Sequence, residues 1–144
     1  MTEPHVDPTR AQFDAFKALP RDQPIEMLNL VAFRETAAYP ADHPNHAEAM
    51  TGTDAYAAYG RESGPVLARV GGTIIWRGAM ETMLIGPEGE RWDACFIARY
   101  PNAGAFLAMV TDPEYQKAVV HRQAAVATSR LIRCAPKTGG DGFA

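Results

Sequence analysis

Cysteine is scarce in this chain, and its two cysteines do not follow a metal-binding or redox pattern. Cys95 and Cys134 lie far apart, each inside an apolar, strand-like run, and neither belongs to a C-x-x-C pair. Isolated cysteines in such runs are usually buried and behave as small hydrophobic side chains. We therefore expect two buried, reduced thiols and no zinc site.

Long hydrophobic runs and an excess of basic side chains are also absent. Apolar stretches such as Met27–Phe33 are far shorter than the roughly 20 residues of a membrane-spanning helix, and Glu3 and Asp7 do not fit a signal peptide. Against 17 acidic residues stand 14 basic ones, scattered along the chain, and the net charge is -3. Without a basic stripe to bind phosphates, we expect a cytoplasmic protein with neither a membrane nor a nucleic-acid partner.

Several motifs of known chemistry are missing as well. No G-x-S-x-G, P-loop or G-x-G-x-x-G pattern occurs, so serine-hydrolase and nucleotide chemistry have no support. His43 and His46 lie near Asp42 and Glu48 in the long connection 35–52, but no third ligand follows at a suitable spacing. We expect no metal and no cofactor, and we interpret this connection as a lid.

What is present is the composition of an ordinary globular protein. The 144 residues are 47% hydrophobic and 22% charged, which suits a single domain. We divide the chain into an N-terminal helical extension (1–24), a main domain (25–135) and a flexible, glycine-rich tail (136–144).

The first half of the chain predicts two helices. Phe13 and Phe16 recur at helical spacing within residues 8–19, which predicts a short leading helix. Thr53 is a candidate N-cap for a second helix that Pro65 kinks or splits and that Gly71 ends in a left-handed conformation.

The second half predicts two further helices joined by a break. Asn102 is a candidate N-cap for a helix that ends near Val110. Asp112 and Pro113 then start another helix that runs to about Thr128.

Four segments have the β-branched and aromatic content of strands. Residues 25–34 and 91–101 are apolar on both faces, residues 73–86 contain a possible bulge at Gly78, and residues 129–135 form a short final strand. The loop GPEGE joins the second and third strands as a hairpin.

The order of these elements predicts a ferredoxin-like α+β fold. After the leading helix it reads βαββαβ, which gives a four-stranded antiparallel sheet with helices on one face. Because two strands are apolar on both faces, the uncovered face needs a partner, and a second copy of the chain is the simplest one. We therefore expect a homodimer.

Five stretches of the sequence resemble a known family: MLNLVAFR, AYAAYGRESGPVL, GGTIIWRG, WDACFIARYPNAGAF and DPEYQKAVVHRQAA. Together they are similar to the family called domain of unknown function 1330, within the dimeric α+β barrel superfamily, over about residues 25–135. The resemblance implies a sheet-to-sheet dimer with a pocket between each sheet and its helices. It implies no activity, although relatives of this fold include cofactor-free monooxygenases, isomerases and dehydratases.

Three residues are candidates for catalysis. His121 is our candidate general acid or base, because histidine is the side chain most often used for proton transfer, while its neighbour Arg122 suits a carboxylate or enolate. Asn29 interrupts an apolar strand, so its amide needs hydrogen-bond partners and is a candidate for holding an oxyanion. The alternatives are a solvated helix face, with Arg122 paired to Glu114, and an Asn29 that bonds a nearby loop.

Four residues are candidates for binding a ligand: Tyr59, Trp76, Asp93 and Tyr115. The aromatic residues would form pocket walls, with ordinary core packing as the alternative. Asp93 shares a strand face with Arg99, and these two charges either line a pocket or pair with Arg77.

These candidates lead to two hypotheses, and a purely structural dimer with no pocket is a third option. The first is a cofactor-independent enzyme that acts on a small organic acid or an aromatic or enolisable metabolite by acid–base chemistry. The second is a dimer of the same fold that binds or senses a small molecule without catalysis.

Overall fold

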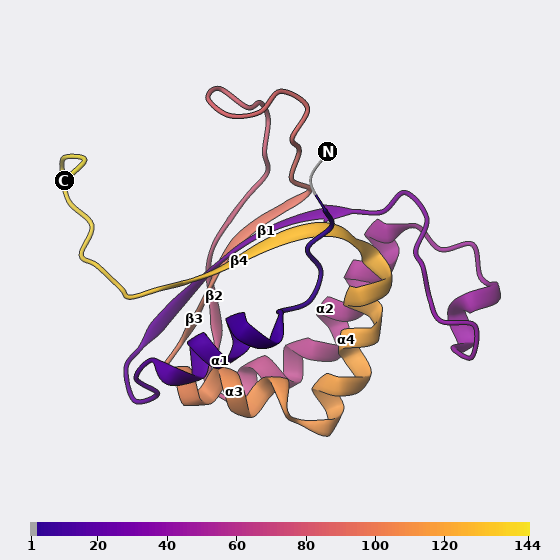
Figure 1. Ribbon diagram of the computed structural model, residues 1–144, viewed down its shortest axis with the longest axis horizontal. Helices are drawn as coiled ribbons and strands as arrows, with labels where there is room; N and C mark the ends of the chain where they lie inside the picture. Colours follow the sequence, from indigo (N-terminus) through magenta and orange to yellow (C-terminus); the bar gives the residue numbers. More distant parts are fainter. Residues whose placement is uncertain (1–2) are drawn as a thin grey trace.

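The computed structural model describes residues 3–144 and contains one antiparallel sheet whose helices all cover the same face (Figure 1). The strands lie in the order β2-β3-β1-β4. This order and the alternation of elements confirm the predicted ferredoxin-like α+β fold. The elements are α1 (Arg10–Ala18), β1 (Ile25–Phe33), the 3-10 helix η1 (Pro44–Ala47), α2 (Gly52–Arg69), β2 (Thr73–Gly78), β3 (Ala94–Tyr100), α3 (Ala103–Val110), α4 (Pro113–Ala125) and β4 (Val126–Cys134).

The leading helix is confirmed as α1, and it begins with a capping box. The Thr9 side chain accepts a hydrogen bond from the Gln12 backbone, and the Gln12 side chain accepts one from the Thr9 backbone. Two otherwise unpaired amide groups are satisfied in this way. No residue of α1 is fully buried, so this helix lies at the edge of the core.

Helix α2 begins at a different N-cap from the predicted one, and it is not split. Its N-cap is Thr51, whose side chain accepts from the Asp54 amide, so Thr53 is not the cap. Pro65 lies inside the helix without splitting it. An interior proline removes one hydrogen bond of the helix and crowds the preceding turn, but α2 continues past it to Arg69 and packs along α4. The predicted left-handed residue is confirmed at Gly71, which has φ 84°.

In the hairpin of β2 and β3, the strands are shorter and the connecting loop is longer than predicted. Strand β2 ends at Gly78, where it pairs with Cys95, and residues 79–93 form a loop that projects from the sheet (Figure 1). The apolar residues Leu84 and Ile85 are therefore exposed, because β3 offers no partner beyond this point. The irregularity in β2 lies between Ile74 and Trp76 and not at Gly78.

The caps predicted in the second half of the chain are confirmed. Asn102 accepts a hydrogen bond from the Ala105 amide at the start of α3, and Asp112 accepts one from the Glu114 amide at the start of α4. The last helix ends at Ala125, earlier than predicted, because the chain enters β4 directly at Val126.

The core lies between the sheet and its helices. Alternate residues of β1 face this core, including Ile25, Met27 and Val31, which are all buried. Both cysteines are free, as predicted, but the prediction that both are buried is wrong. Cys95 is only partly buried, and Cys134 is exposed because it is the last residue of the edge strand β4. No helix among residues 3–144 is long and apolar enough to cross a membrane.

Candidate functional site

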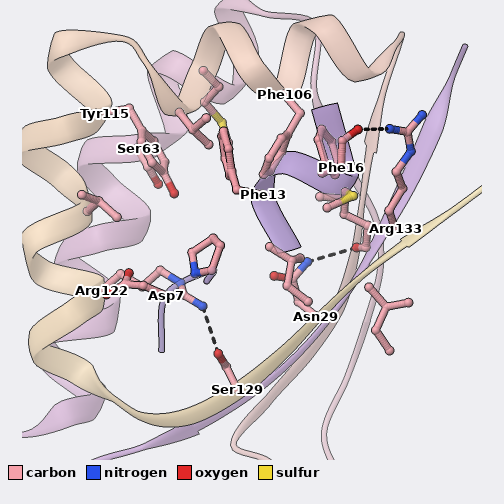
Figure 2. A pocket seen from close by; sticks show the side chains of 18 of the residues that line it. Asp7, Phe13, Phe16, Asn29, Ser63, Phe106, Tyr115, Arg122, Ser129 and Arg133 are labelled. Carbon is pink, nitrogen blue, oxygen red and sulfur yellow. Dashed lines mark hydrogen bonds between the residues drawn. The ribbon is translucent and has the colours of Figure 1, made fainter. Parts of the chain in front are cut away.

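A cavity of about 1440 Å³ lies between the sheet and the helices. Its walls come from all four strands of the sheet, from α2, α3 and α4, and from α1 with the N-terminal segment that leads into it (Figure 2). Pockets of roughly 300–1,000 Å³ already hold drug-sized molecules. The space is therefore large enough for a small organic ligand.

One side of this cavity is closed by residues 5–19, which we call the N-terminal cover. Its first residues are attached to β4, since the Ser129 amide donates to the His5 carbonyl at 2.7 Å. Its far end is held by Arg133, which donates to the carbonyl groups of Phe16 at 3.2 Å and of Pro20 at 2.6 Å. The cover was predicted as a helical extension, and only its position in the fold identifies it as a wall of the cavity.

Arg122 lies in the cavity and carries a charge without an acidic partner. Its Nη1 donates to the Val6 carbonyl at 2.6 Å and its Nη2 to the Ser129 hydroxyl at 3.2 Å. Glu114, the acidic partner considered above, instead lies 3.6 Å from Arg69. Among the described residues, no carboxylate forms an ion pair with Arg122.

Asn29 also lines the cavity, where it follows Met27 on the helix-facing side of β1. Its amide nitrogen donates to the Met27 carbonyl at 3.0 Å, as Figure 2 shows. Its amide oxygen accepts no hydrogen bond from residues 3–144. Arg122 and Asn29 therefore face the same space and leave both a cation and an acceptor available.

Three tyrosines from α2 and α4 form a further polar part of the wall. The hydroxyl groups of Tyr59 and Tyr115 lie 2.8 Å apart, and the rings of Tyr56 and Tyr59 are 5.4 Å apart. Burial raises the pKa of all three phenols well above the ordinary value, although the positive charge of Arg122 acts in the opposite direction. The three phenols are therefore neutral at physiological pH and serve as hydrogen-bond groups, not as bases.

The opposite part of the wall is aromatic. The rings of Phe16 and Phe106 are 5.0 Å apart, and Tyr100 meets Phe106 edge-on at 5.4 Å. Figure 2 shows Phe13, Phe16 and Phe106 around the same hollow as Arg122. Arg122 therefore lies at one end of the cavity and a cluster of aromatic rings at the other, where the Arg133 guanidinium lies 4.8 Å from the centre of the Phe16 ring.

His121 is buried, with 7% of its surface exposed, but it is not among the residues that line the cavity. Its Nδ1 lies 2.6 Å from the Tyr39 hydroxyl and its Nε2 lies 2.7 Å from a Glu62 carboxylate oxygen. Successive residues of a helix point about 100° apart, so His121 and Arg122 project from different sides of α4. The three residues that we expected to act together are therefore divided between two places.

Two of the expected ligand-binding residues lie outside the cavity. Trp76 pairs with Ile97 on the sheet face turned away from the helices, and 49% of its surface is exposed. Asp93 is exposed and accepts a hydrogen bond from the Phe33 amide at 2.8 Å. Arg99, which we expected on the same strand face as Asp93, forms an ion pair with Glu26 at 2.9 Å. The expected pairing with Arg77 is not formed.

The connection 35–52 does not cover the cavity. Its residue Ala38 donates a backbone hydrogen bond to the Ala124 carbonyl at 2.8 Å, which attaches the connection to α4. The His43 ring stacks on the Tyr39 ring at 4.7 Å. No group of three or more potential metal ligands occurs in residues 3–144.

Comparison with known proteins gives a family and close structural relatives. The family described as "Domain of unknown function (DUF1330)" matches residues 46–133. A crystal structure of the RPA0582 protein of unknown function from Rhodopseudomonas palustris is 53% identical, with a TM-score of 0.87, and the match covers 94% of this chain and 99% of that one. Methylated RPA0582 protein gives 52% identity, a TM-score of 0.89 and coverage of 97% and 100%.

A more distant structure shares the fold alone. An uncharacterised NIPSNAP-like domain protein from Burkholderia xenovorans is 17% identical, with a TM-score of 0.52 and coverage of 85% of this chain and 93% of that one. None of the curated proteins matches this chain. The N-terminal cover lies before the part of the chain that the family matches.

Proposed function

Because the chain belongs to the DUF1330 family, whose description names no activity, we propose its function from the cavity itself: it binds a small organic acid with an aromatic body. The observation that carries this proposal is Arg122, a partly buried cation in the cavity wall without a carboxylate partner. Removing a charge from water is costly unless an opposite charge or hydrogen bonds compensate for it. A ligand carboxylate would provide that compensation.

The geometry of the guanidinium group suits this role. Arginine has five N–H donors in a planar fork that matches the two oxygens of a carboxylate. The hydrogen bonds to Val6 and Ser129 use two of these donors. Three donors remain, so a carboxylate can bind Arg122 without displacing the N-terminal cover.

The other end of the cavity favours an aromatic body. Phe13, Phe16 and Phe106 surround it, and aromatic pairs gain about 0.5–1.5 kcal/mol beyond the burial of their surface. A ligand with one anionic end and one apolar end would satisfy both parts of the wall.

A binding or sensing protein has more support than an enzyme that uses His121. A general base must lie within hydrogen-bond reach of the proton that it removes. His121 is instead held between Tyr39 and Glu62, outside the cavity lining. The neutral tyrosines can polarise a ligand oxygen, but they do not replace a base that titrates near neutrality.

We also propose that two copies of the chain pair through the sheet face turned away from the helices. This outer face carries Leu28 and Leu30 from β1, Ile97 from β3 and Ile132 from β4, as the strand registers place them. Trp76 adds a large exposed apolar surface. A twofold axis would let the same face cover its own copy.

The proposed ligand class is tested with two probes of the same shape. 2-Naphthoate carries a carboxylate, whereas 2-naphthamide is neutral, and binding of each is measured by calorimetric titration. We expect the wild-type protein to prefer the carboxylate by about tenfold or more, because hydrogen bonds to charged groups contribute about 1.5–3 kcal/mol. Arg122→Gln should remove the preference.

The controls separate charge at this site from charge elsewhere. Arg61 is exposed on α2 and does not line the cavity, so Arg61→Gln should keep the wild-type preference. Ser129→Ala removes a partner of Arg122 but retains the charge, and it should also keep the preference. Equal binding of the two probes by the wild-type protein would disprove the proposal.

A further inference from the structure

The cavity contains a second polar region, separate from Arg122, in the hydroxyl groups of Tyr59 and Tyr115. Tyr59 comes from α2 and Tyr115 from the first turn of α4, and their oxygens are 2.8 Å apart. Both residues line the cavity, and only 7% of the Tyr115 surface is exposed. Figure 2 shows the Tyr115 side chain beside Ser63, above the hollow that Arg122 borders from below.

The number of hydroxyl protons in this region exceeds the number of bonds between the hydroxyl groups. Each phenol has one proton, and the bond between Tyr59 and Tyr115 uses one of the two. Ser63 lies close enough to Tyr59 to lower the pKa of its phenol, and the Ser63 hydroxyl adds one acceptor and one further proton to this region. A row of hydroxyl groups joined by hydrogen bonds thus always has one proton more than it has bonds. That proton is available to an acceptor outside the row, such as a ligand oxygen.

Tyr56 adds a second such donor. Its ring neighbours that of Tyr59 and lines the same cavity, and its hydroxyl makes no hydrogen bond with residues 3–144. Since burial keeps these phenols protonated, the region can donate at least two hydrogen bonds. Groups that accept such bonds are carbonyl, phenol and enolate oxygens.

The spacing between Tyr115 and Arg122 limits which ligands can contact both polar regions at once. Tyr115 and Arg122 are seven residues apart on α4, which places them about 10 Å apart along the helix axis. Two turns of helix bring them to nearly the same side, which agrees with the position of both in the cavity wall. A molecule that bridges them needs two oxygen groups at opposite ends of an aromatic body.

We propose that Tyr59 and Tyr115 form an oxygen-binding subsite, so that the ligand is an aromatic acid with a hydroxyl or carbonyl oxygen at the end opposite its carboxylate. This inference rests on the proposed function, because Arg122 must hold the carboxylate. The phenols select among organic acids, while Arg122 selects for acids in general.

Three naphthoates test the subsite by titration calorimetry. 2-Naphthoate lacks the second oxygen, 6-hydroxy-2-naphthoate carries it at the far end, and 3-hydroxy-2-naphthoate carries it beside the carboxylate. We expect the wild-type protein to bind the 6-hydroxy compound about fivefold or more tightly than 2-naphthoate, which is the range of one or two neutral hydrogen bonds. The 3-hydroxy compound should gain no such advantage.

The deciding variant is Tyr59→Phe combined with Tyr115→Phe. Replacing both members of the bonded pair with phenylalanine, which has nearly the same shape, removes the two hydroxyl groups together, so the fold should persist. We expect this variant to bind 6-hydroxy-2-naphthoate and 2-naphthoate with equal affinity, so that the preference for the 6-hydroxy compound is lost. Tyr39→Phe is the matched control, because Tyr39 lies outside the cavity lining, and it should keep the preference.

The outcomes distinguish this inference from the proposed function. If 2-naphthoate binds through Arg122 but the 6-hydroxy compound has no advantage, the subsite is disproved and the proposed function stands. The same holds if the advantage survives in the double variant. If no naphthoate binds to the wild-type protein, both proposals fail together.

Discussion

Arg122 has two roles in this account: it holds the N-terminal cover over the cavity, and it is the proposed binding group for the ligand carboxylate. Its guanidinium group binds the Val6 carbonyl of the N-terminal cover and the Ser129 hydroxyl of β4, and it still has donors for a ligand. The Ser129 hydroxyl in turn donates to the His5 carbonyl at 2.8 Å. One side chain therefore links α4, β4 and the cover, and a ligand bound there contacts all three indirectly.

Buried tyrosines should make the protein less stable at alkaline pH. Burial raises the pKa of Tyr56, Tyr59, Tyr100 and Tyr115 above about 10, the ordinary value that these phenols regain in the unfolded chain. The folded state then holds its protons more tightly. The resulting contribution to stability is complete below about pH 10 and is lost as the pH rises further.

We therefore predict that the free energy of unfolding falls steeply above about pH 10. Urea unfolding at a series of pH values measures it, and phenolate absorbance follows ionisation of the tyrosines. The variant with both Tyr59→Phe and Tyr115→Phe should show a weaker pH dependence, because it lacks two of the raised phenols. Ionisation of these phenols near pH 10 in an intact fold would contradict this expectation.

Some single residues were predictable from sequence and others were not. Asn102 and Asp112 were identified as caps because their signal is local, a short polar side chain followed by helix-forming residues. The separation of His121 from Arg122 was not predictable, since it depends on which sides of α4 meet the sheet and α2. Trp76 was misplaced for a similar reason, because the irregularity in β2 reverses which residues face the helices.

At the scale of elements, the N-terminal cover is the part of the fold that most affects access to the cavity. Its helix α1 has no fully buried residue, and it is held by hydrogen bonds from β4 and by the contact of Phe16 with Phe106. Segments with few buried contacts open more easily than the core. The cover is therefore the part of the wall that is best suited to open for a ligand.

This leads to a prediction for a chain that begins at Pro20. Without the cover the cavity loses Phe13 and Phe16, so we expect 2-naphthoate to bind at least about tenfold more weakly. Stopped-flow fluorescence should also show faster dissociation. A chain that ends at Ala135 is the control, since the tail 136–144 does not line the cavity.

Unchanged affinity and dissociation in the chain that begins at Pro20 would show that the cover takes no part in binding. The helical spacing of Phe13 and Phe16 predicted α1 itself. It did not predict the packing of α1 over the cavity, because that depends on hydrogen bonds to Arg122, Ser129 and Arg133, more than 100 residues away in the sequence.

At the scale of the whole molecule, the outer face of the sheet is the surface that most needs a partner. Trp76 and Ile132 have 49% and 46% of their surfaces exposed there, beside the half-buried Leu28, Leu30 and Ile97. Apolar patches of this kind on a folded protein mark interfaces. The sequence predicted this face correctly from strands that are apolar on both sides.

We predict that light scattering gives twice the 15.7 kDa of one chain at micromolar concentration. Trp76→Glu should shift the protein toward the monomer, since Trp76 is exposed on the outer face and a buried, unpaired charge is costly at an interface. Leu84→Glu is the matched control, because Leu84 is 89% exposed in the loop 79–93 and away from the sheet. A wild-type protein that scatters as a single chain would disprove the pairing.

The measurement that tests the central claim most directly is a crystal structure of the protein with 2-naphthoate. We predict that the naphthalene ring lies among Phe13, Phe16 and Phe106 and that the carboxylate accepts hydrogen bonds from Arg122 at about 2.7–2.9 Å. Naphthoate bound only on the outer sheet face, or in the cavity with its carboxylate away from Arg122, would contradict the claim that this cavity recognises organic acids.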